Sequence, residues 1–165
     1  MKKTMIALAV LFALNVGTAV YAEKQISSAH QELCTAKEAV DEQIEYLDVV
    51  YNTAERYDIE PELAIAMMKI ESNFDTSAES SAGCLGLMQV SPIHSTANLL
   101  DLRENVECSF SLLSNYIDEE ESLHEALGRY NRGTTGYRIY VRCTNQTATE
   151  YSKKVINLMN ELKNQ

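Results

Sequence analysis

The sequence has no tryptophan, two prolines and six glycines among its 165 residues, and aromatic side chains make up 7% of it. So little proline and glycine excludes collagen-like and proline-rich low-complexity chains and is compatible with long, uninterrupted helices. Basic residues are also scarce, because 14 lysines and arginines stand against 24 aspartates and glutamates, for a net charge of −10. This excess of negative charge argues against nucleic acid as a partner.

No apolar run in the sequence reaches the roughly 20 residues that a membrane-spanning helix needs. The longest candidate runs from Met5 to Val20, follows two lysines and ends next to a Tyr-Ala pair that suits cleavage after Ala22. These features favour a secretory signal peptide over residues 1–22 rather than a membrane anchor. The exported chain would then be one soluble domain, residues 23–165, with 12 basic residues against 24 acidic ones once the two lysines are removed.

The four cysteines contain no Cys-x-x-Cys pair, and the three histidines lack the spacing of metal ligands, so neither a metal nor a cofactor is expected. An even number of cysteines in an exported protein instead favours two disulfides, for which there are three pairings. We expect Cys84 with Cys108 and Cys34 with Cys143. The second bridge would close a long loop and therefore restrict the unfolded chain most.

Apolar residues recur at steps of three and four through most of the exported chain, which predicts a mainly α fold without strands. Pro61 suits the first position of a helix, and residues 106–117 show the same period in another. Capping-box patterns at residues 122–125 and 147–150 predict the starts of two more helices, with a turn at residues 133–136. The first helix carries one apolar stripe, formed by Leu33, Ala36, Val40, Ile44, Leu47, Tyr51 and Ala54.

Glu71 is a carboxylate in apolar surroundings on the second predicted helix. The residues expected on the buried face of that helix are Leu63, Met67, Ile70 and Phe74. At about 100° per residue, Glu71 lies about 80° from Leu63, on the shoulder of this face. Burial and the helix C-terminus both disfavour the charged form, so the pKa should rise, and a protonated carboxyl can donate to a leaving oxygen. From helix position alone, an ordinary boundary glutamate paired with a basic residue is the commoner explanation.

The residues after Glu71 are more specific. The chain continues as Glu-Ser-Asn-Phe-Asp, then Ser80, then Gly-Leu-Met-Gln at 86–89, and about 40 residues later Tyr-Asn-Arg-Gly at 130–133. This combination resembles the catalytic domain of soluble lytic transglycosylases, which share the goose-type lysozyme-like fold. The resemblance covers about residues 58–133 and implies a single helical domain of that fold.

By position, the resemblance implies that Glu71 is the single catalytic acid and base. It implies a lining of the substrate cleft by the residues that match the other motif positions, namely Ser80, Gly86, Gln89, Tyr130 and Asn131. The chain departs from the family pattern at Cys84, where a small residue is usual, and at Arg132 and the Thr134-Thr135 turn, where a small or proline-containing ending is commoner. These departures concern details of the cleft, while the catalytic position is unaffected.

The reaction implied by the resemblance is cleavage of the β-1,4 bond between N-acetylmuramic acid and N-acetylglucosamine, with formation of a 1,6-anhydro end. A hydrolysing glycosidase usually needs a second carboxylate. The nearest in sequence are Asp75 and Glu79, while Gln89 stands where a hydrolase would place such a group. Two alternatives stay open, a muramidase of the same fold that adds water and a non-catalytic wall-binding or scaffold protein.

The resemblance and the export signal together imply a periplasmic protein whose partner is the peptidoglycan strand, and no membrane after signal cleavage. The chain is similar to small exported transglycosylases encoded with secretion systems, conjugation machinery or type IV pili, which implies local wall opening for such an apparatus. A prophage enzyme or a general wall-turnover enzyme would look similar.

The acidic run at residues 118–121 is expected to be a solvated interhelical loop.

Overall fold

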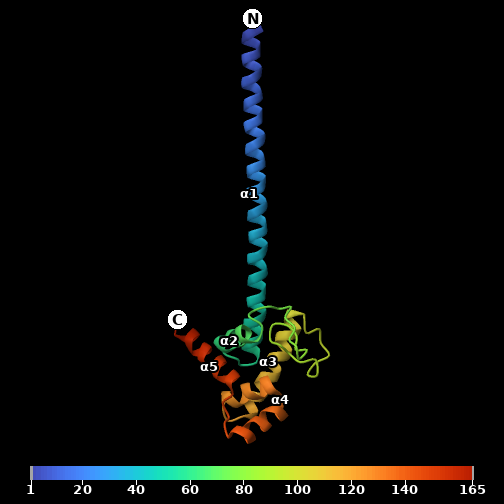
Figure 1. Ribbon diagram of the computed structural model, residues 1–165, viewed down its shortest axis with the longest axis vertical. Coiled ribbons are helices and arrows are strands. Elements are labelled where there is room, and N and C mark those ends of the chain that lie inside the picture. Colours follow the sequence, from blue (N-terminus) through green and yellow to red (C-terminus); the bar gives the residue numbers. More distant parts are fainter. Residues whose placement is uncertain (1, 165) are drawn as a thin grey trace. The chain divides into compact units, whose positions relative to one another are not determined.

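The protein is described by a computed structural model, which covers the backbone of residues 2–164 and the side chains of residues 21, 23–38 and 44–164. Its helices are α1 (Lys2–Arg56), α2 (Pro61–Glu71), α3 (Leu102–Glu119), α4 (Leu123–Thr144) and α5 (Glu150–Lys163) (Figure 1). Between residues 2 and 164 extended pairing is limited to two isolated bridges, Glu79 with Leu85 and Leu85 with Val90. The predicted mainly α fold is confirmed.

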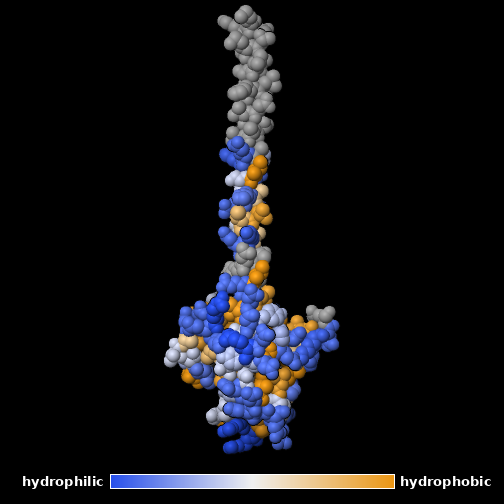
Figure 2. Space-filling view, turned by 180° about the vertical axis from the view of Figure 1, so that it is seen from behind, coloured by the Kyte–Doolittle hydropathy of each residue, from blue (hydrophilic) through white to orange (hydrophobic). Residues whose placement is uncertain are grey.

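The chain divides into two parts, one ending at Glu45 and the other beginning at Tyr46. In the first part the described large apolar side chains of α1, which include Ile26, Leu33 and Ile44, are exposed. Figure 2 shows hydrophobic residues of this stretch on the surface among hydrophilic ones. The predicted apolar stripe is therefore exposed over most of its described length and is buried only at Ala54; the side chain of Val40 lies outside the described residues.

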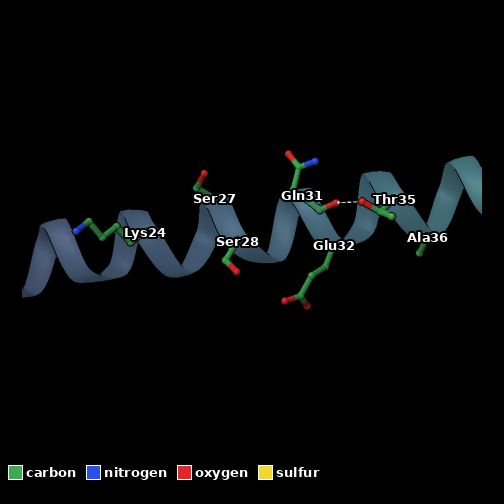
Figure 3. A pocket seen from close by; sticks show the side chains of 7 residues that line it. All are labelled: Lys24, Ser27, Ser28, Gln31, Glu32, Thr35 and Ala36. Atoms are coloured by element: carbon green, nitrogen blue, oxygen red, sulfur yellow. Dashed lines mark hydrogen bonds between the residues drawn. The ribbon is translucent and has the colours of Figure 1, made fainter.

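A shallow depression along α1 is lined by side chains of this one helix, among them Lys24, Gln31 and Glu32 (Figure 3). The hydroxyl of Thr35 donates a hydrogen bond to the backbone carbonyl of Gln31, at 2.9 Å. The hydrogen-bond donor of this side chain is therefore already used within the helix. Apart from Tyr21, the side chains of the predicted signal peptide lie outside the described residues. Among the described residues, no helix has the length and apolar content to cross a membrane.

The second part of the chain encloses one hydrophobic core, in which α2 packs on α5 and α4 packs on both α3 and α5 (Figure 1). All of these helices contribute fully or nearly fully buried side chains, and so do α1 and the segment between α2 and α3. The largest of these side chains are Val50, Met67, Met68, Leu87, Met88, Val106, Phe110, Leu113, Leu127 and Val155.

The buried face of α2 differs from the predicted one. Leu63 and Met67 are buried as expected, whereas Ile70 and Phe74 are 36% and 42% exposed. Ala64, Ala66 and Met68 are buried as well, which makes the buried face wider than expected. At about 100° per residue Glu71 lies between Met67 and Ala64, so it falls inside this wider buried face rather than on its shoulder.

The caps of the later helices follow the predicted starts with one correction. Ser122 caps α4 by accepting a hydrogen bond from the backbone of Glu125, as predicted. At α5 the cap is Thr149, which accepts from the backbone N–H of Ser152, and not Thr147. The carbonyl of Thr147 instead accepts a hydrogen bond from the hydroxyl of Tyr137, at 2.9 Å.

The predicted turn at residues 133–136 and the predicted solvated acidic loop are both modified. Only Gly133, at φ 68° and ψ 159°, leaves helical geometry, so α4 kinks there and continues. In the acidic run, Glu119 and Glu120 pair with Arg129 at 2.7 and 2.6 Å, and Arg129 is largely buried. Two side chains of the acidic run therefore form ion pairs with Arg129, so the run does not point wholly into water.

The four cysteines carry free thiols in the structure, so neither predicted disulfide, Cys84–Cys108 or Cys34–Cys143, is formed in it. Cys34 belongs to the first part of the chain and Cys143 to the second. Cys84 and Cys108 both belong to the second part.

Candidate active site

Glu71 is the last residue of α2 and its carboxyl group is partly buried. Burial raises the pKa of Glu71 to about 7, because the charged form loses hydration, and a hydrogen bond from Tyr151 opposes this rise. Close to neutral pH the protonated and ionised forms are therefore both populated. A carboxyl in this state can act as an acid in one step and as a base in the next.

Tyr151 is the direct partner of Glu71. Its hydroxyl donates a hydrogen bond to Oε1 of Glu71 at 2.5 Å, from α5 to the end of α2. The pKa of Tyr151 is raised well above its usual value, first by burial and then by the charge of Glu71, so the hydroxyl keeps its proton. This bond fixes one carboxyl oxygen and leaves the other for a different contact.

A tight turn follows α2 and depends on Gly86. Its φ is 73°, and a Cβ there would lie 2.4 Å from the carbonyl oxygen of Leu99 and 2.5 Å from Nδ2 of Asn105. Asn105 is 1% exposed and holds the turn, since its amide nitrogen donates to the carbonyls of Leu85 and Leu99 and its oxygen accepts from the backbone of Met88. Only glycine fits the backbone at this point of close approach.

Gln89 closes the same turn in a defined orientation. Its side-chain nitrogen donates to the carbonyls of Ala78 at 3.2 Å and Gly86 at 3.0 Å. Both amide hydrogens are thereby used, so the carbonyl oxygen is the group that Gln89 can offer to a ligand. A sugar hydroxyl bound by Gln89 would have to be a donor.

Tyr130 connects α4 to this turn. Its hydroxyl donates to the carbonyl of Met88 at 2.8 Å and lies 2.8 Å from Oγ of Ser109 on α3. The pKa of Tyr130 is raised, first by burial and then by the charge of Glu71. The hydroxyl of Tyr130 is therefore neutral, and its hydrogen bonds hold the turn and α3 in place. Tyr130 itself lines the cleft.

A cavity of about 540 Å³ brings most of the motif residues together. Glu71, Ser80, Gln89, Tyr130 and Asn131 all line it, and Gly86 does not. Gly86 acts beneath the surface instead, where it lets the turn pack on Asn105. Among the other lining residues are Ser91, Ile93, His94, Arg132 and Gly133.

Glu71 is the one carboxylate among the residues that line this cavity. Asp75 is exposed and accepts hydrogen bonds from the backbone and hydroxyl of Ser77, at 2.8 and 2.7 Å, which lower the pKa of Asp75. Glu79 is also exposed and lies outside the lining. The two nearest acidic residues in sequence are therefore not placed to act with Glu71.

Three residues of the site were not identified as site residues from the sequence. Tyr151 belongs to a helix 80 positions further along, and no motif links it to Glu71. Ser109 and Asn105 act through the buried bonds described above. The sequence offered one sign of the role of Ser109, which is a polar residue next to the regularly spaced apolar residues of α3. A fully buried hydroxyl at such a position needs a hydrogen-bond partner.

The catalytic motif and the fold agree with a known family. Residues 48–153 match the family described as Transglycosylase SLT domain. The chain belongs to this family. The resemblance inferred from the sequence is thereby confirmed, and the matched residues contain all five residues that form the motif lining of the cavity.

The chain is also similar to part of several curated relatives. One is "Membrane-bound lytic murein transglycosylase C" of Actinobacillus pleuropneumoniae serotype 5b, 48% identical over 48 residues, which are 29% of this chain and 13% of that protein. Proteins of the same name from Edwardsiella ictaluri and Yersinia enterocolitica are each 47% identical over 45 residues, 27% of this chain and 12% and 13% of theirs. The similarity thus spans about an eighth of the length of these relatives.

Proposed function

We propose that this SLT-domain chain is a peptidoglycan lytic transglycosylase, which cleaves the bond between N-acetylmuramic acid and N-acetylglucosamine and leaves a 1,6-anhydro end. The observation that carries the proposal is the cleft with one carboxylate, Glu71, whose pKa of about 7 suits both proton donation and proton acceptance. Membership of the family and the lytic murein transglycosylase relatives support the same substrate.

In the proposed reaction Glu71 first protonates the glycosidic oxygen, and the bond from this oxygen to C1 of the muramic residue breaks. The resulting carboxylate then takes the proton of the C6 hydroxyl of that residue while the C6 oxygen forms a bond to C1. Glu71 ends the cycle protonated, as it began, and no water is consumed. The substrate's own N-acetyl group would stabilise the positive charge that develops at C1.

The lining of the cavity supports ring closure over hydrolysis. An inverting or retaining hydrolase usually needs a second carboxylate beside the sugar, as base or nucleophile. In this cavity Glu71 has no carboxylate partner, and Asp75 and Glu79 are exposed and outside the lining. An internal hydroxyl nucleophile removes the need for that second group.

The test is the chemistry of the product. Purified protein is incubated with peptidoglycan sacculi, and the released fragments are analysed by mass spectrometry. We expect fragments with anhydro ends, which are lighter by one water than fragments with reducing ends. Reducing ends alone would identify a muramidase. No release, with retained binding to sacculi, would identify a wall-binding protein.

Glu71→Gln is the variant that links this product to the site. Loss of a general acid and base typically lowers a rate by about 10² to 10⁴-fold, so release should fall by at least about 100-fold. Glu79→Gln is the matched control, because Glu79 is exposed and outside the cavity. Equal activity of Glu71→Gln and wild type would exclude Glu71 from the reaction.

The proposed setting is the periplasm, where the chain would open the wall locally for an envelope-spanning secretion, conjugation or pilus apparatus. The export signal predicted in residues 1–22 supports the location, and the assembly role follows only from similarity to small exported transglycosylases. Cell fractionation tests the location, and we expect the protein in the periplasmic fraction. A deletion strain with normal assembly of every such apparatus would contradict the role.

The disulfide between Cys84 and Cys108 is a further part of the proposal. It would be formed on export, and it is supported by the presence of both cysteines in the same part of the chain, the one that begins at Tyr46. Peptide mapping of exported protein without reductant should recover the two cysteine peptides as one species. Their recovery as separate peptides would show that the thiols remain free.

A further inference from the structure

The active-site cavity differs in charge balance from the chain as a whole, because its lining holds as many basic as acidic side chains. The chain has a net charge of −10, yet the charged residues among those lining the cavity are one acid, Glu71, and one arginine, Arg132. His94 lines it as well. A guanidinium in the binding cleft of an otherwise acidic protein is a feature that the reaction at Glu71 does not use.

Arg132 differs from the other well-placed arginines in its partner. Arg129 is paired with Glu119 and Glu120, and Arg56 is paired with Glu107. The guanidinium of Arg132 instead lies over the ring of Tyr140, 4.7 Å from its centroid, and among the described side chains no carboxylate pairs with it. Its position is therefore set by a ring, which leaves its N–H groups available to an anion.

The backbone supports the same orientation. Arg132 comes directly before Gly133, whose φ of 68° and ψ of 159° kink α4 at the edge of the cavity. Asn131, Arg132 and Gly133 all line the cavity, so the kink forms part of its rim. Tyr140 lies beyond the kink on the same helix, and its hydroxyl donates to the carbonyl of Ala148, which anchors the ring.

We propose that Arg132 is a specificity residue that binds a carboxylate carried by the muramic acid unit of the substrate, held ready by stacking on Tyr140. This inference rests on the proposed function, because that function names the polymer. Such a unit carries a lactyl group on its sugar. In intact wall this group is joined to a stem peptide with free carboxylates, and in peptide-free strands its own carboxylate is free. A planar guanidinium binds either carboxylate with two parallel hydrogen bonds.

The test is a binding measurement that does not depend on turnover. Isothermal titration is performed in the Glu71→Gln background with three soluble glycan fragments: one with stem peptides, one with the peptides removed, and a neutral oligomer of N-acetylglucosamine. Arg132→Gln should weaken binding of a carboxylate-bearing fragment by about three- to tenfold, since the site is partly exposed to water. It should leave binding of the neutral oligomer unchanged.

Matched variants isolate the guanidinium and its support. Arg138→Gln removes an exposed charge from the same helix outside the cavity and should change no affinity. Arg132→Lys keeps the charge without the planar fork and should give an intermediate loss. Tyr140→Phe keeps the ring and should bind nearly as well as wild type, whereas Tyr140→Leu should approach the loss seen with Arg132→Gln. Thermal unfolding of each variant checks that the fold is kept.

The outcomes distinguish the two carboxylates and the two proposals. A loss confined to the peptide-bearing fragment assigns the stem carboxylates, and a loss confined to the peptide-free fragment assigns the lactyl carboxylate. Equal losses for charged and neutral fragments, or no loss for either, would overturn the role of Arg132. Arg132-dependent binding in a protein that forms no anhydro ends would refute the proposed reaction and leave this inference standing.

Discussion

Burial and the hydroxyl of Tyr151 act in opposite directions on Glu71. Burial favours the neutral carboxyl, while the hydrogen bond from Tyr151 at 2.5 Å favours the carboxylate. The resulting pKa of about 7 lies between the values that each influence would produce alone. In the proposed reaction Glu71 gives a proton and takes one back within a single cycle, which needs this balance. Tyr151 would then act as a positioning residue that sets the pKa of Glu71.

Replacing Tyr151 by phenylalanine should therefore change the pH dependence as well as the rate. In the proposed reaction the free enzyme must be protonated at Glu71, so kcat/KM should fall as pH rises through the pKa of Glu71. Tyr151→Phe removes a bond that lowers this pKa, so the alkaline limb should move to higher pH, by about one pH unit. The measurement is a pH profile of anhydro-product release.

Tyr57→Phe serves as the control for this profile. Its hydroxyl also donates to a carboxylate, that of Glu107 at 2.6 Å, but neither residue lines the active-site cavity. The control should leave the alkaline limb in place. A limb that stays fixed, or moves to lower pH, in Tyr151→Phe would remove Tyr151 from the electrostatics of the site.

The raised pKa of Glu71 also has a consequence for stability. The ordinary value is 4.5 and the folded value about 7, so the folded protein binds this proton more tightly than the unfolded chain does. The stabilisation from protonated Glu71 is complete below pH 4.5 and is lost as pH rises to about 7, up to about 3 kcal/mol in all. Glu71→Gln has no proton to lose.

Urea unfolding of wild type and Glu71→Gln at several pH values tests this consequence. Relative to wild type, the variant should gain unfolding free energy between pH 4.5 and pH 7 and then keep a constant advantage. Glu79→Gln, exposed and outside the cavity, should show no such gain. A difference between Glu71→Gln and wild type that is independent of pH would mean that Glu71 is not perturbed in the folded protein.

At the scale of elements, the turn after α2 depends on two glycines with similar positive φ angles and different surroundings. Gly83 and Gly86 have φ values of 77° and 73°. A Cβ at Gly83 meets open space, whereas at Gly86 it meets Leu99 and Asn105 closer than 3 Å. Gly83→Ala should cost about 1 kcal/mol of unfolding free energy, from backbone conformation alone. Gly86→Ala should cost about 2 kcal/mol more, from the added overlap.

Chemical denaturation of the two alanine variants measures this difference directly. Because the φ penalty is common to both, the difference between their unfolding free energies reports the packing of the turn on Asn105. Equal losses would show that the contacts around Gly86 relax without cost. Product release should also fall in Gly86→Ala, because the shifted turn carries Gln89 into a different orientation.

The sequence predicted the helix boundaries that depend on interactions within a few residues. It was wrong about the buried face of a helix, which depends on packing against other helices. Pro61 begins α2 and Ser122 caps α4 because fixed φ and a side-chain acceptor act within a few residues. The buried face of α2 was placed wrongly, since Ala64 and Met68 lie in the core of the folded chain and Phe74, which was expected there, is exposed. No local pattern contains that information.

The site divides in the same way. The motif predicted Ser80, Gln89, Tyr130 and Asn131 as site residues, and these residues line one cavity with Glu71. Tyr151 could not be found from the sequence, because its contact with Glu71 joins the ends of two helices across 80 positions. A motif records which residues recur together along the chain, whereas this contact depends on how α5 packs on α2.

At the scale of the whole molecule, α1 changes character along its length. The large apolar side chains described in its first part, Ile26, Leu33 and Ile44 among them, are exposed. Its last turns belong to the second part, where Val50 and Ala54 are 2% and 1% exposed and Arg56 pairs with Glu107 on α3. The boundary of the stable unit should therefore lie within this helix, between Glu45 and Val50, rather than at its end.

Two truncations placed on either side of that boundary test this expectation. Removal of residues 1–44 deletes described side chains that are exposed or partly exposed, so thermal unfolding should stay cooperative and product release should persist. Removal of residues 1–57 also takes Val50 and Ala54 out of the core and should cost at least about 3 kcal/mol. If both truncations lost the same stability, residues 1–44 would have to contribute to the core, and the division of the chain at Tyr46 would be wrong. If neither lost any, the last turns of α1 would be dispensable, and the core would have to close without Val50.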